Sequence, residues 1–305
     1  MAGRTPTAGK DAGGMTTLQI DHRTTYVYRQ SVSLGPHRMM LRPRESRDVK
    51  LIATKLAIDP LPSLTWANDV FGNTVATATF VDPVSTLIID SQVTLDHSGE
   101  AWPVFDIAAS AISFPFTYND DERLDLGALL MPQYHDPDRR LATWARGFVR
   151  GEVTDTLSML KDLNAAMSAW VSYQSRDEEG TQGPLDTLAR GWGSCRDIAV
   201  LLIEAARWLG FGARIVSGYL CDTGATAGAI VGSAQAGSTH AWAEIYLPGA
   251  GWVAFDPTNR TVGGASLIPV AMARHVNQVV PVSGSFIGAS DAFVSLRVTV
   301  SVRSV

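Results

Sequence analysis

The first third of the chain alternates between hydrophobic and polar residues with a period of two. Runs with this alternation, rich in β-branched and aromatic residues, extend from Leu18 to Asp96 and are separated by turn signals such as the Gly72-Asn73 pair. The turns recur about every 8 to 12 residues, the spacing of an antiparallel sandwich or barrel. The sequence therefore predicts a β-sandwich-like N-terminal domain at 16–105, preceded by a disordered tail at 1–15.

Beyond a connector at 106–122 the hydrophobic period becomes helical. Large hydrophobic residues at steps of three and four predict a helix from about Thr154 to Tyr173. A second helix is expected just before it, with Asp136 as N-cap and Pro137 at the first helical position. A third and more hydrophobic helix follows the turn GWGS and ends at Gly210.

Strand-like runs return after the third helix, at 213–220, 239–247 and 251–256. Together with the helices they predict a core domain of helices and strands at 123–262. The tail at 263–305 returns to a β pattern and is expected to form a C-terminal extension. Because the β-rich and helical parts are segregated along the chain, the predicted fold class is α+β.

Composition restricts the function classes. With 46% hydrophobic and 18% charged residues, the chain is typical of a soluble globular protein. A net charge of −5 argues against a general nucleic-acid binder. The most hydrophobic stretch, 198–209, contains Glu204 and Arg207 and is shorter than the roughly 20 apolar residues that a membrane span needs. We therefore expect neither nucleic acid nor membrane as a partner, and the sequence leaves the oligomeric state open.

Cysteine and histidine usage points to an intracellular protein without a metal. The chain has only 2 cysteines, too few for a disulfide framework, and its N-terminus lacks the apolar segment of a secretory signal. No two histidines stand at metal-ligand spacing, and no acidic calcium loop is present. The sequence therefore indicates a cytoplasmic location and no cofactor.

Cys195 lies where the turn GWGS enters the third helix. At a helix N-terminus the unpaired N–H groups and the positive end of the helix dipole favour a thiolate over a thiol, which makes a cysteine nucleophilic at neutral pH. Taken alone, a cysteine beside a hydrophobic helix is more often a small core residue. Cys195 therefore needs acid–base partners elsewhere in the sequence before it can be read as a nucleophile.

His240 and Asp256 are placed to be those partners. His240 begins one strand and Asp256 ends the next, and side chains two apart on a strand share a face. If a three-residue loop joins the strands, Leu247 faces Gly251, and Asp256 falls opposite Trp242 with His240 as its diagonal neighbour. A slip of one residue would send Asp256 to the other face. For either residue alone, a locally bonded strand-end group is an equally good interpretation.

Two sequence blocks carry a family resemblance. The pattern GxGSCRDxAxLLxxxxRxLGxxAR at Gly191–Arg214 and the pattern THAWAEIYLPGxGWxxFDPTN at Thr239–Asn259 resemble the signature blocks of the transglutaminase-like superfamily. The β-rich start and the tail resemble its bacterial branch, in which a β-rich N-terminal domain precedes the core. The resemblance implies a papain-like, transglutaminase-like cysteine-enzyme core between a β-sandwich-like domain and a β-rich C-terminal tail.

The resemblance also implies residue roles. Cys195 would be the nucleophile, His240 the base that becomes an acid, and Asp256 the group that fixes the imidazole tautomer. Trp192 and Trp242 are weaker candidates for a second oxyanion donor or a wall of the substrate groove. The implied activity is acyl transfer from a peptide or isopeptide amide through a thioester.

The sequence does not decide which molecule accepts the acyl group from the thioester. Hydrolysis, which makes the protein a peptidase or amidase, is favoured because no sequence feature excludes water or provides an amine site. Transfer to an amine, as in a true transglutaminase, and a catalytically silent binding protein are the alternatives. Asp222–Ser238, rich in Gly and Ala, is expected to be a mobile flap over a peptide or protein substrate.

Overall fold

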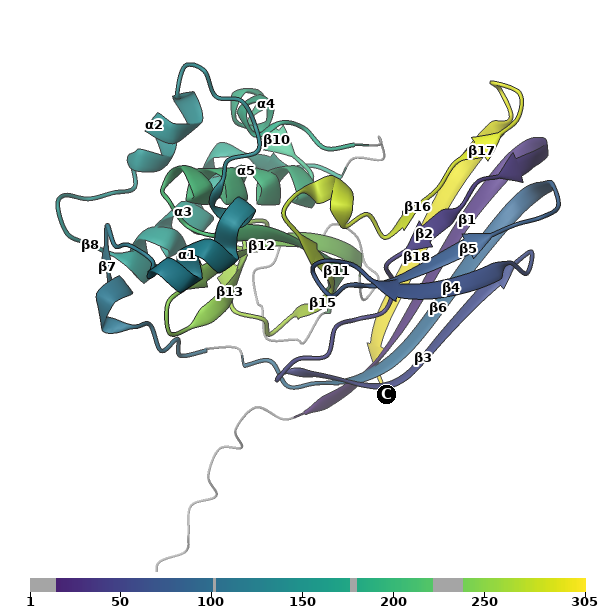
Figure 1. Ribbon diagram of the computed structural model, residues 1–305, viewed down its shortest axis with the longest axis horizontal. Helices are drawn as coiled ribbons and strands as arrows, with labels where there is room; N and C mark the ends of the chain where they lie inside the picture. Colours follow the sequence, from purple (N-terminus) through teal and green to yellow (C-terminus); the bar gives the residue numbers. More distant parts are fainter. Residues whose placement is uncertain (1–14, 101–102, 176–179, 222–237) are drawn as a thin grey trace, which may run out of the picture.

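The computed structural model describes residues 15–100, 103–175, 180–221 and 238–305 (Figure 1). The helices are α1 (Asp120–Leu126), α2 (Arg140–Arg146), α3 (Thr156–Trp170), α4 (Pro184–Arg190) and α5 (Cys195–Trp208). Single turns of 3₁₀ helix lie at Ala109–Ala111, Gly127–Leu130 and Val276–Gln278. The α+β class expected from the sequence is confirmed.

The strands gather into sheets on the two sides of the molecule in Figure 1. The N-terminal strands are β1 (Thr16–Leu34), β2 (His37–Met39), β3 (Val49–Asp59), β4 (Ser63–Asn68), β5 (Thr74–Thr79) and β6 (Val84–His97). The central strands are β7 (Ser113–Phe114), β8 (Thr154–Asp155), β9 (Ser172–Tyr173), β10 (Trp192–Gly193), β11 (Ala213–Leu220), β12 (Ser238–Leu247), β13 (Gly251–Asp256) and β14 (Thr261–Val262). The C-terminal strands are β15 (Leu267–Ala273), β16 (Val282–Ser283), β17 (Phe286–Ile287) and β18 (Phe293–Ser304).

The N-terminal domain is a sandwich of two antiparallel sheets. One has the order β17-β1-β6-β3, with β18 also paired to β1, and the other has the order β16-β2-β5-β4. Their inner faces share one hydrophobic cluster, which includes Tyr28 and Ile89 from the first sheet and Met39 and Ala78 from the second. The period-two pattern read from the sequence is the physical cause, since alternate side chains of each strand enter this shared core.

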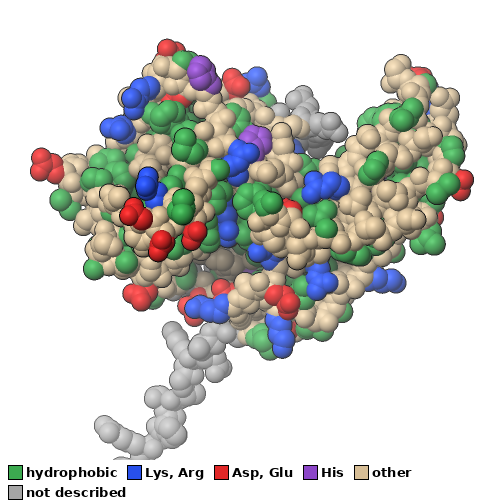
Figure 2. All heavy atoms as spheres, viewed as in Figure 1, with side chains coloured by type: hydrophobic (Ala, Val, Ile, Leu, Met, Phe, Trp, Pro, Cys, Tyr) green, Lys and Arg blue, Asp and Glu red, His purple; other side chains and the backbone are tan. Residues whose placement is uncertain are grey.

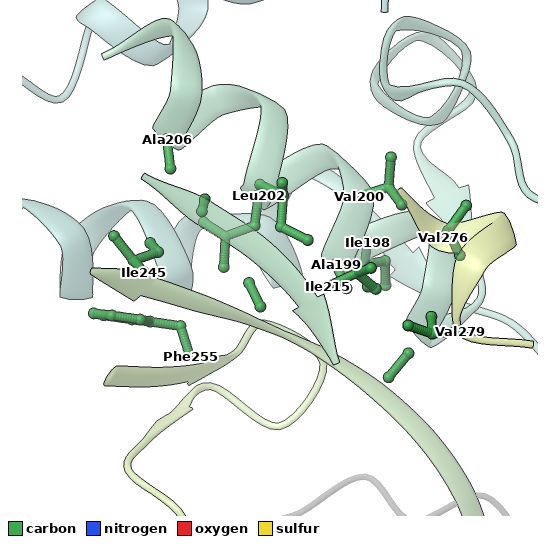
Figure 3. Packing of buried hydrophobic residues seen from close by; sticks show 14 of the residues in the cluster. Ile198, Ala199, Val200, Leu202, Ala206, Ile215, Ile245, Phe255, Val276 and Val279 are labelled. Carbon is green, nitrogen blue, oxygen red and sulfur yellow. The ribbon is translucent and has the colours of Figure 1, made fainter. Parts of the chain in front are cut away.

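The core is built from a sheet with α5 packed on one face. The sheet has the order β14-β13-β12-β11-β15, and all its pairs are antiparallel. Figure 3 shows side chains of α5, such as Leu202 and Ala206, between the helix and Ile215, Ile245 and Phe255 of three neighbouring strands. This burial holds α5 in a fixed orientation, so that its N-terminus lies at a defined place on the sheet.

One helix begins later than the sequence predicts. The N–H of Arg139 donates to the carbonyl of Asp136 at 3.0 Å, which closes a turn, and Arg139 has a φ of 52°. Helix α2 therefore starts at Arg140 and not at Pro137. The Asp136 carboxylate still accepts from the N–H groups of Arg140 at 2.8 Å and Ala142 at 3.0 Å, so its capping function survives at a longer spacing.

The C-terminal part joins both halves of the molecule. β15 pairs with β11 inside the core sheet, so this sheet extends past residue 262, where the sequence pattern ends the core. β18 instead pairs with β1 from Leu18 to Tyr28 in the N-terminal domain. The long-range pairing, which no local pattern encodes, thus ties the two domains together.

Polar contacts also cross between the domains. His22 Nδ1 lies 2.9 Å from the hydroxyl oxygen of Tyr219, and both side chains are buried. Asn73 donates to the carbonyl of Met272 at 2.8 Å and accepts from its N–H at 2.9 Å. The N-terminal domain is therefore packed against the core sheet at a fixed position. Among the described residues, every helix is too short or too polar to cross a bilayer.

Candidate active site

The N-terminus of α5 is held in place by a fully buried carboxylate. Ser194 is the N-cap, and its N–H and hydroxyl both donate to Asp197 Oδ2 at 2.8 Å. The N–H of Gln182 donates to Asp197 Oδ1 at 2.7 Å, so the loop before α4 is tied to the same acid. Asp197 thus has a structural role: it fixes the helix turn from which Cys195 projects.

The β12–β13 hairpin has the register that the sequence predicts. Leu247 pairs with Gly251 across a three-residue loop, and Ala243 pairs with Phe255. Continuing this register brings Asp256 opposite Trp242 and diagonal to His240. His240 Nε2 lies 2.8 Å from Asp256 Oδ2, so the imidazole and the carboxylate meet on one face of the sheet.

Every described contact of the Asp256 carboxylate favours its charged form. Besides His240, Oδ2 accepts from Asn259 Nδ2 at 2.8 Å, and Oδ1 accepts from the N–H groups of Thr258 and Asn259 at 3.0 and 3.2 Å. Burial raises the pKa of Asp256, but the charge and hydrogen bond of His240 and the Asn259 donors outweigh it and hold the pKa below its ordinary value. The carboxylate is therefore fixed and ionised, and it faces one nitrogen of the imidazole.

The other side of His240 meets the cysteine. Burial alone lowers the pKa of His240, but the Asp256 carboxylate and a hydrogen bond with Cys195 raise it to about 10. Burial raises the pKa of the Cys195 thiol, yet the His240 hydrogen bond and charge, with the Ala241 N–H, bring it below its ordinary value. Both directions favour a thiolate–imidazolium pair, in a residue that is partly exposed.

The two candidate tryptophans have different surroundings. Trp242 is only 1% exposed, and its ring stacks on His240 with centroids 6.1 Å apart at 25°. Gly218 pairs with His240 on the neighbouring strand, where a Cβ would lie 2.8 Å from Trp242 Cη2. Trp242 is thus buried behind the imidazole and has no surface to offer as a wall or donor to substrate. Trp192 is partly exposed and lies under Arg190, 5.8 Å from its guanidinium carbon.

Tyr173 is a neighbour of Cys195 that sequence reasoning missed. Its strand β9 pairs in parallel with β10, with Tyr173 opposite Gly193, and the N–H of Gln174 donates to the Gly193 carbonyl at 2.9 Å. Burial raises the pKa of Tyr173, and the charge of Cys195 raises it further, so the phenol is protonated near the sulfur. The local signal was a tyrosine directly after a helix, which is too common to identify a site.

Two remaining expectations concern the surroundings of this triad. The predicted flap lies almost entirely outside the described residues, at 222–237. The described residues contain no group of three or more His, Cys, Asp or Glu side chains arranged to hold a metal ion. What can be described is a cysteine thiol, an imidazole and a carboxylate joined in series.

Comparison with known families covers both halves of the chain. The profile described as "Bacterial transglutaminase-like N-terminal region" matches residues 18–96. The profile described as "Transglutaminase-like superfamily" matches residues 142–257. The second match spans Cys195, His240 and Asp256. The two matches follow the order expected from the sequence.

Relatives and solved structures agree with these matches. An uncharacterized protein of Mycobacterium tuberculosis is 29% identical over 286 residues, which span 89% of this chain and 88% of the relative. An uncharacterized protein of Mycobacterium leprae is 24% identical over 292 residues, which span 93% and 99%. The crystal structure of a "Putative Cysteine Protease" from Cytophaga hutchinsonii has a TM-score of 0.72 at 19% identity, covering 95% of this chain and 91% of that one. The chain belongs to the transglutaminase-like superfamily of cysteine-dependent acyltransferases and peptidases, in the bacterial branch that carries a β-rich N-terminal domain before a papain-like core.

Proposed function

We propose that the protein is a cysteine-dependent hydrolase that cleaves a peptide or isopeptide amide through a thioester on Cys195. The observation that carries this proposal is the position of His240, buried between Cys195 and Asp256 and bonded to both. A binding protein has no use for a thiol with a lowered pKa, in a partly exposed residue, beside a protonated imidazole. The catalytically silent alternative therefore has less support.

The first half of the reaction forms the thioester. The Cys195 thiolate attacks the amide carbonyl carbon, and the carbonyl oxygen becomes an oxyanion. When the intermediate collapses, the C–N bond breaks and the imidazolium of His240 gives its proton to the leaving amine. Asp256 keeps the imidazole oriented throughout, as the carboxylate does in serine and cysteine triads.

Two donors are available for the oxyanion. Cys195 is the first residue of α5, so its backbone N–H has no acceptor within the helix and faces the reacting centre. The Tyr173 hydroxyl is the proposed second donor, because Tyr173 lies opposite Gly193, two residues before Cys195, and the charge of Cys195 raises its pKa. Trp242 has less support for this role, because it is only 1% exposed.

The second half releases the acyl group. Neutral His240 takes a proton from water, the hydroxide attacks the thioester carbonyl, and the thiolate leaves as the carboxylic acid forms. The protease name of the Cytophaga hutchinsonii neighbour supports water as acceptor. A primary amine attacking in place of water would give the alternative reaction, a transamidation.

One experiment separates these outcomes. Peptide libraries containing glutamine and asparagine are incubated with the protein, with and without a primary amine, and products are read by mass spectrometry. Backbone cleavage or side-chain deamidation that is unchanged by the amine supports hydrolysis, whereas amine incorporation supports transfer. The Cys195→Ala protein is the control, and products that persist in it contradict both readings.

A further inference from the structure

A cavity of about 350 Å³ lies at the open edge of the N-terminal sandwich, between β3 and β4. Its volume falls in the range of roughly 300–1,000 Å³ that ligand sites occupy. Its floor is made of buried residues, and its walls are hydrophobic side chains that are half-buried or exposed. The floor includes Met39, Leu41, Ala76 and Val93, and the walls include the half-buried Leu56 and the exposed Leu64 and Trp66.

The exposed wall residues occupy core positions of the fold. Trp66 pairs with Ala76 and Leu64 pairs with Ala78, and both alanines are buried between the sheets. Because paired residues point to the same face, Trp66 and Leu64 also point inward. They are nevertheless 53% and 37% exposed. The second sheet thus presents core-type side chains that nothing in the described part of the chain covers.

The facing sheet also has an exposed edge strand, β3, beside the cavity. On β3, Thr54 pairs with Val93 and Leu56 pairs with Ser91, so both point towards the sandwich interior. β3 and β4 each end their sheet within the described residues. An edge strand exposes a row of unpaired N–H and C=O groups, to which an extended peptide can add as a further strand. The cavity therefore has free strand edges on both sides.

The rim of the cavity is positively charged. Arg42 is a lining residue and is exposed, and within the described residues its side chain forms no ion pair or hydrogen bond. Figure 2 shows Lys and Arg side chains interspersed with hydrophobic ones on the face that carries β3 and β4. An unpaired cation beside a hydrophobic cavity favours a ligand that is hydrophobic and acidic.

We propose that this edge binds an extended peptide segment of another protein, with large hydrophobic residues at alternate positions and Asp or Glu beside them. Added to β4, the segment continues the second sheet by backbone hydrogen bonds. Its inward side chains then fill the cavity against Trp66 and Leu64, and an acidic side chain pairs with Arg42. The site is separate from the Cys195 triad and does not rest on the proposed reaction.

The test is selection from a random peptide library whose members are about as long as β4, which has 6 residues. The bait is the full chain carrying Cys195→Ala, so that no peptide is consumed. Counter-selection uses the same chain with Leu64→Ser and Trp66→Ser, which change exposed side chains and are checked for an unaltered melting curve. We expect enriched peptides with alternating hydrophobic residues and acids. No enrichment over the counter-selected chain overturns the proposal.

Direct binding of an enriched peptide then tests each part of the site. Trp66→Ser should weaken the affinity at least about tenfold, as for a central hydrophobic contact. Arg42→Glu should remove the preference for acidic over amide side chains, and an unchanged preference overturns the charge assignment. Displacement of the peptide by equimolar laurate would show a lipid pocket instead. Self-association that Trp66→Ser abolishes would show a dimer edge, and either result overturns the proposal.

Discussion

Helix α5 carries buried charged groups at both of its ends, and the two ends differ in what those groups contact. At the C-terminal end, Glu204 and Arg207 form an ion pair of 2.7 Å with side chains only 1% exposed. Backbone groups consume the rest of their bonding capacity: Gln133 and Tyr134 donate to Glu204, and Arg207 donates to the carbonyls of Leu129, Ala213 and Arg274. This end fastens the helix to the surrounding chain.

At the N-terminal end the charged groups are also buried, but they are linked in a series whose last residue, Cys195, is partly exposed. Asp256 is satisfied by His240 and Asn259, His240 is bonded to Cys195, and Cys195 keeps part of its surface exposed. A buried ion pair whose other partners are backbone groups, and which has no exposed member, can serve only the fold. A charge whose partner is a titratable and reachable group can do chemistry. Six measurements can break or sharpen this distinction.

The largest expected effect is from Cys195→Ala. Removing the sulfur removes the nucleophile, so turnover of any amide that the library identifies should fall to the background rate. The side chain is small and stands at the start of the helix, so the unfolding transition should remain cooperative and close to that of the unmodified protein. Turnover that persists in Cys195→Ala would show that Cys195 is not the nucleophile.

Asp256→Asn should lower turnover by up to about four orders of magnitude, because the amide no longer fixes the imidazole tautomer. The variant keeps nearly the same shape, so far-UV circular dichroism should not change. Asn259→Ala serves as the matched control, since it removes one donor to the same carboxylate but leaves His240 bonded to it. Equal losses in the two variants would contradict the orienting role.

Arg207→Met should cost about 3–5 kcal/mol of unfolding free energy, because it leaves Glu204 charged and unpaired in the interior. The activity per folded molecule should not change. The matched control is Arg150→Met, which breaks an exposed ion pair of 2.8 Å with side chains 76% and 46% exposed. That pair should contribute less than about 1 kcal/mol. Urea unfolding curves measure both, and similar costs would break the comparison.

The pH profile tests the thiolate–imidazolium pair. The thiolate–imidazolium pair exists from the lowered pKa of Cys195 up to the His240 pKa of about 10. The rate of Cys195 alkylation by iodoacetamide should therefore be constant across this range and change near pH 10. In Asp256→Asn this alkaline step should move to lower pH, because the carboxylate no longer raises the His240 pKa. A step at the same pH in both proteins would show that Asp256 does not raise the His240 pKa.

The raised pKa of His240 also predicts how the stability of the protein depends on pH. The folded pKa of His240, about 10, lies above its value of about 6.5 in an unfolded chain. Its stabilising contribution is therefore fully present below about pH 6.5 and is lost as the pH rises towards 10. Unfolding curves at increasing pH should show this loss in the unmodified protein and a smaller one in Asp256→Asn.

The smallest effect is expected from Tyr173→Phe. Losing one oxyanion donor should lower kcat roughly 100- to 1,000-fold while leaving the rate of Cys195 alkylation unchanged, because alkylation forms no oxyanion. Ser172→Ala, one residue earlier on the same short strand, is the matched control and should leave kcat unchanged. Equal kcat for Tyr173→Phe and the unmodified protein would remove Tyr173 from the site.

The sequence alone carried much of the site. The hairpin loop between Leu247 and Gly251 fixes which residues of β12 and β13 share a face, because side chains alternate strictly along a strand. That parity was enough to bring His240 beside Asp256. The hydrophobic spacing of α5, with the helix start at Cys195, follows from equally local rules. These features depend only on neighbouring residues, so a pattern in the chain determines them.

Only the tertiary structure decided the contacts between distant segments. Tyr173 reaches the site because β9 pairs with β10, and Trp242 is buried because Gly218 leaves room for it on the neighbouring strand. β18 closes onto β1 more than 260 residues earlier, whereas β15 joins the core sheet. The local pattern of a strand says which face is hydrophobic but not which strand lies beside it, because pairing partners are chosen by the packing of the whole chain.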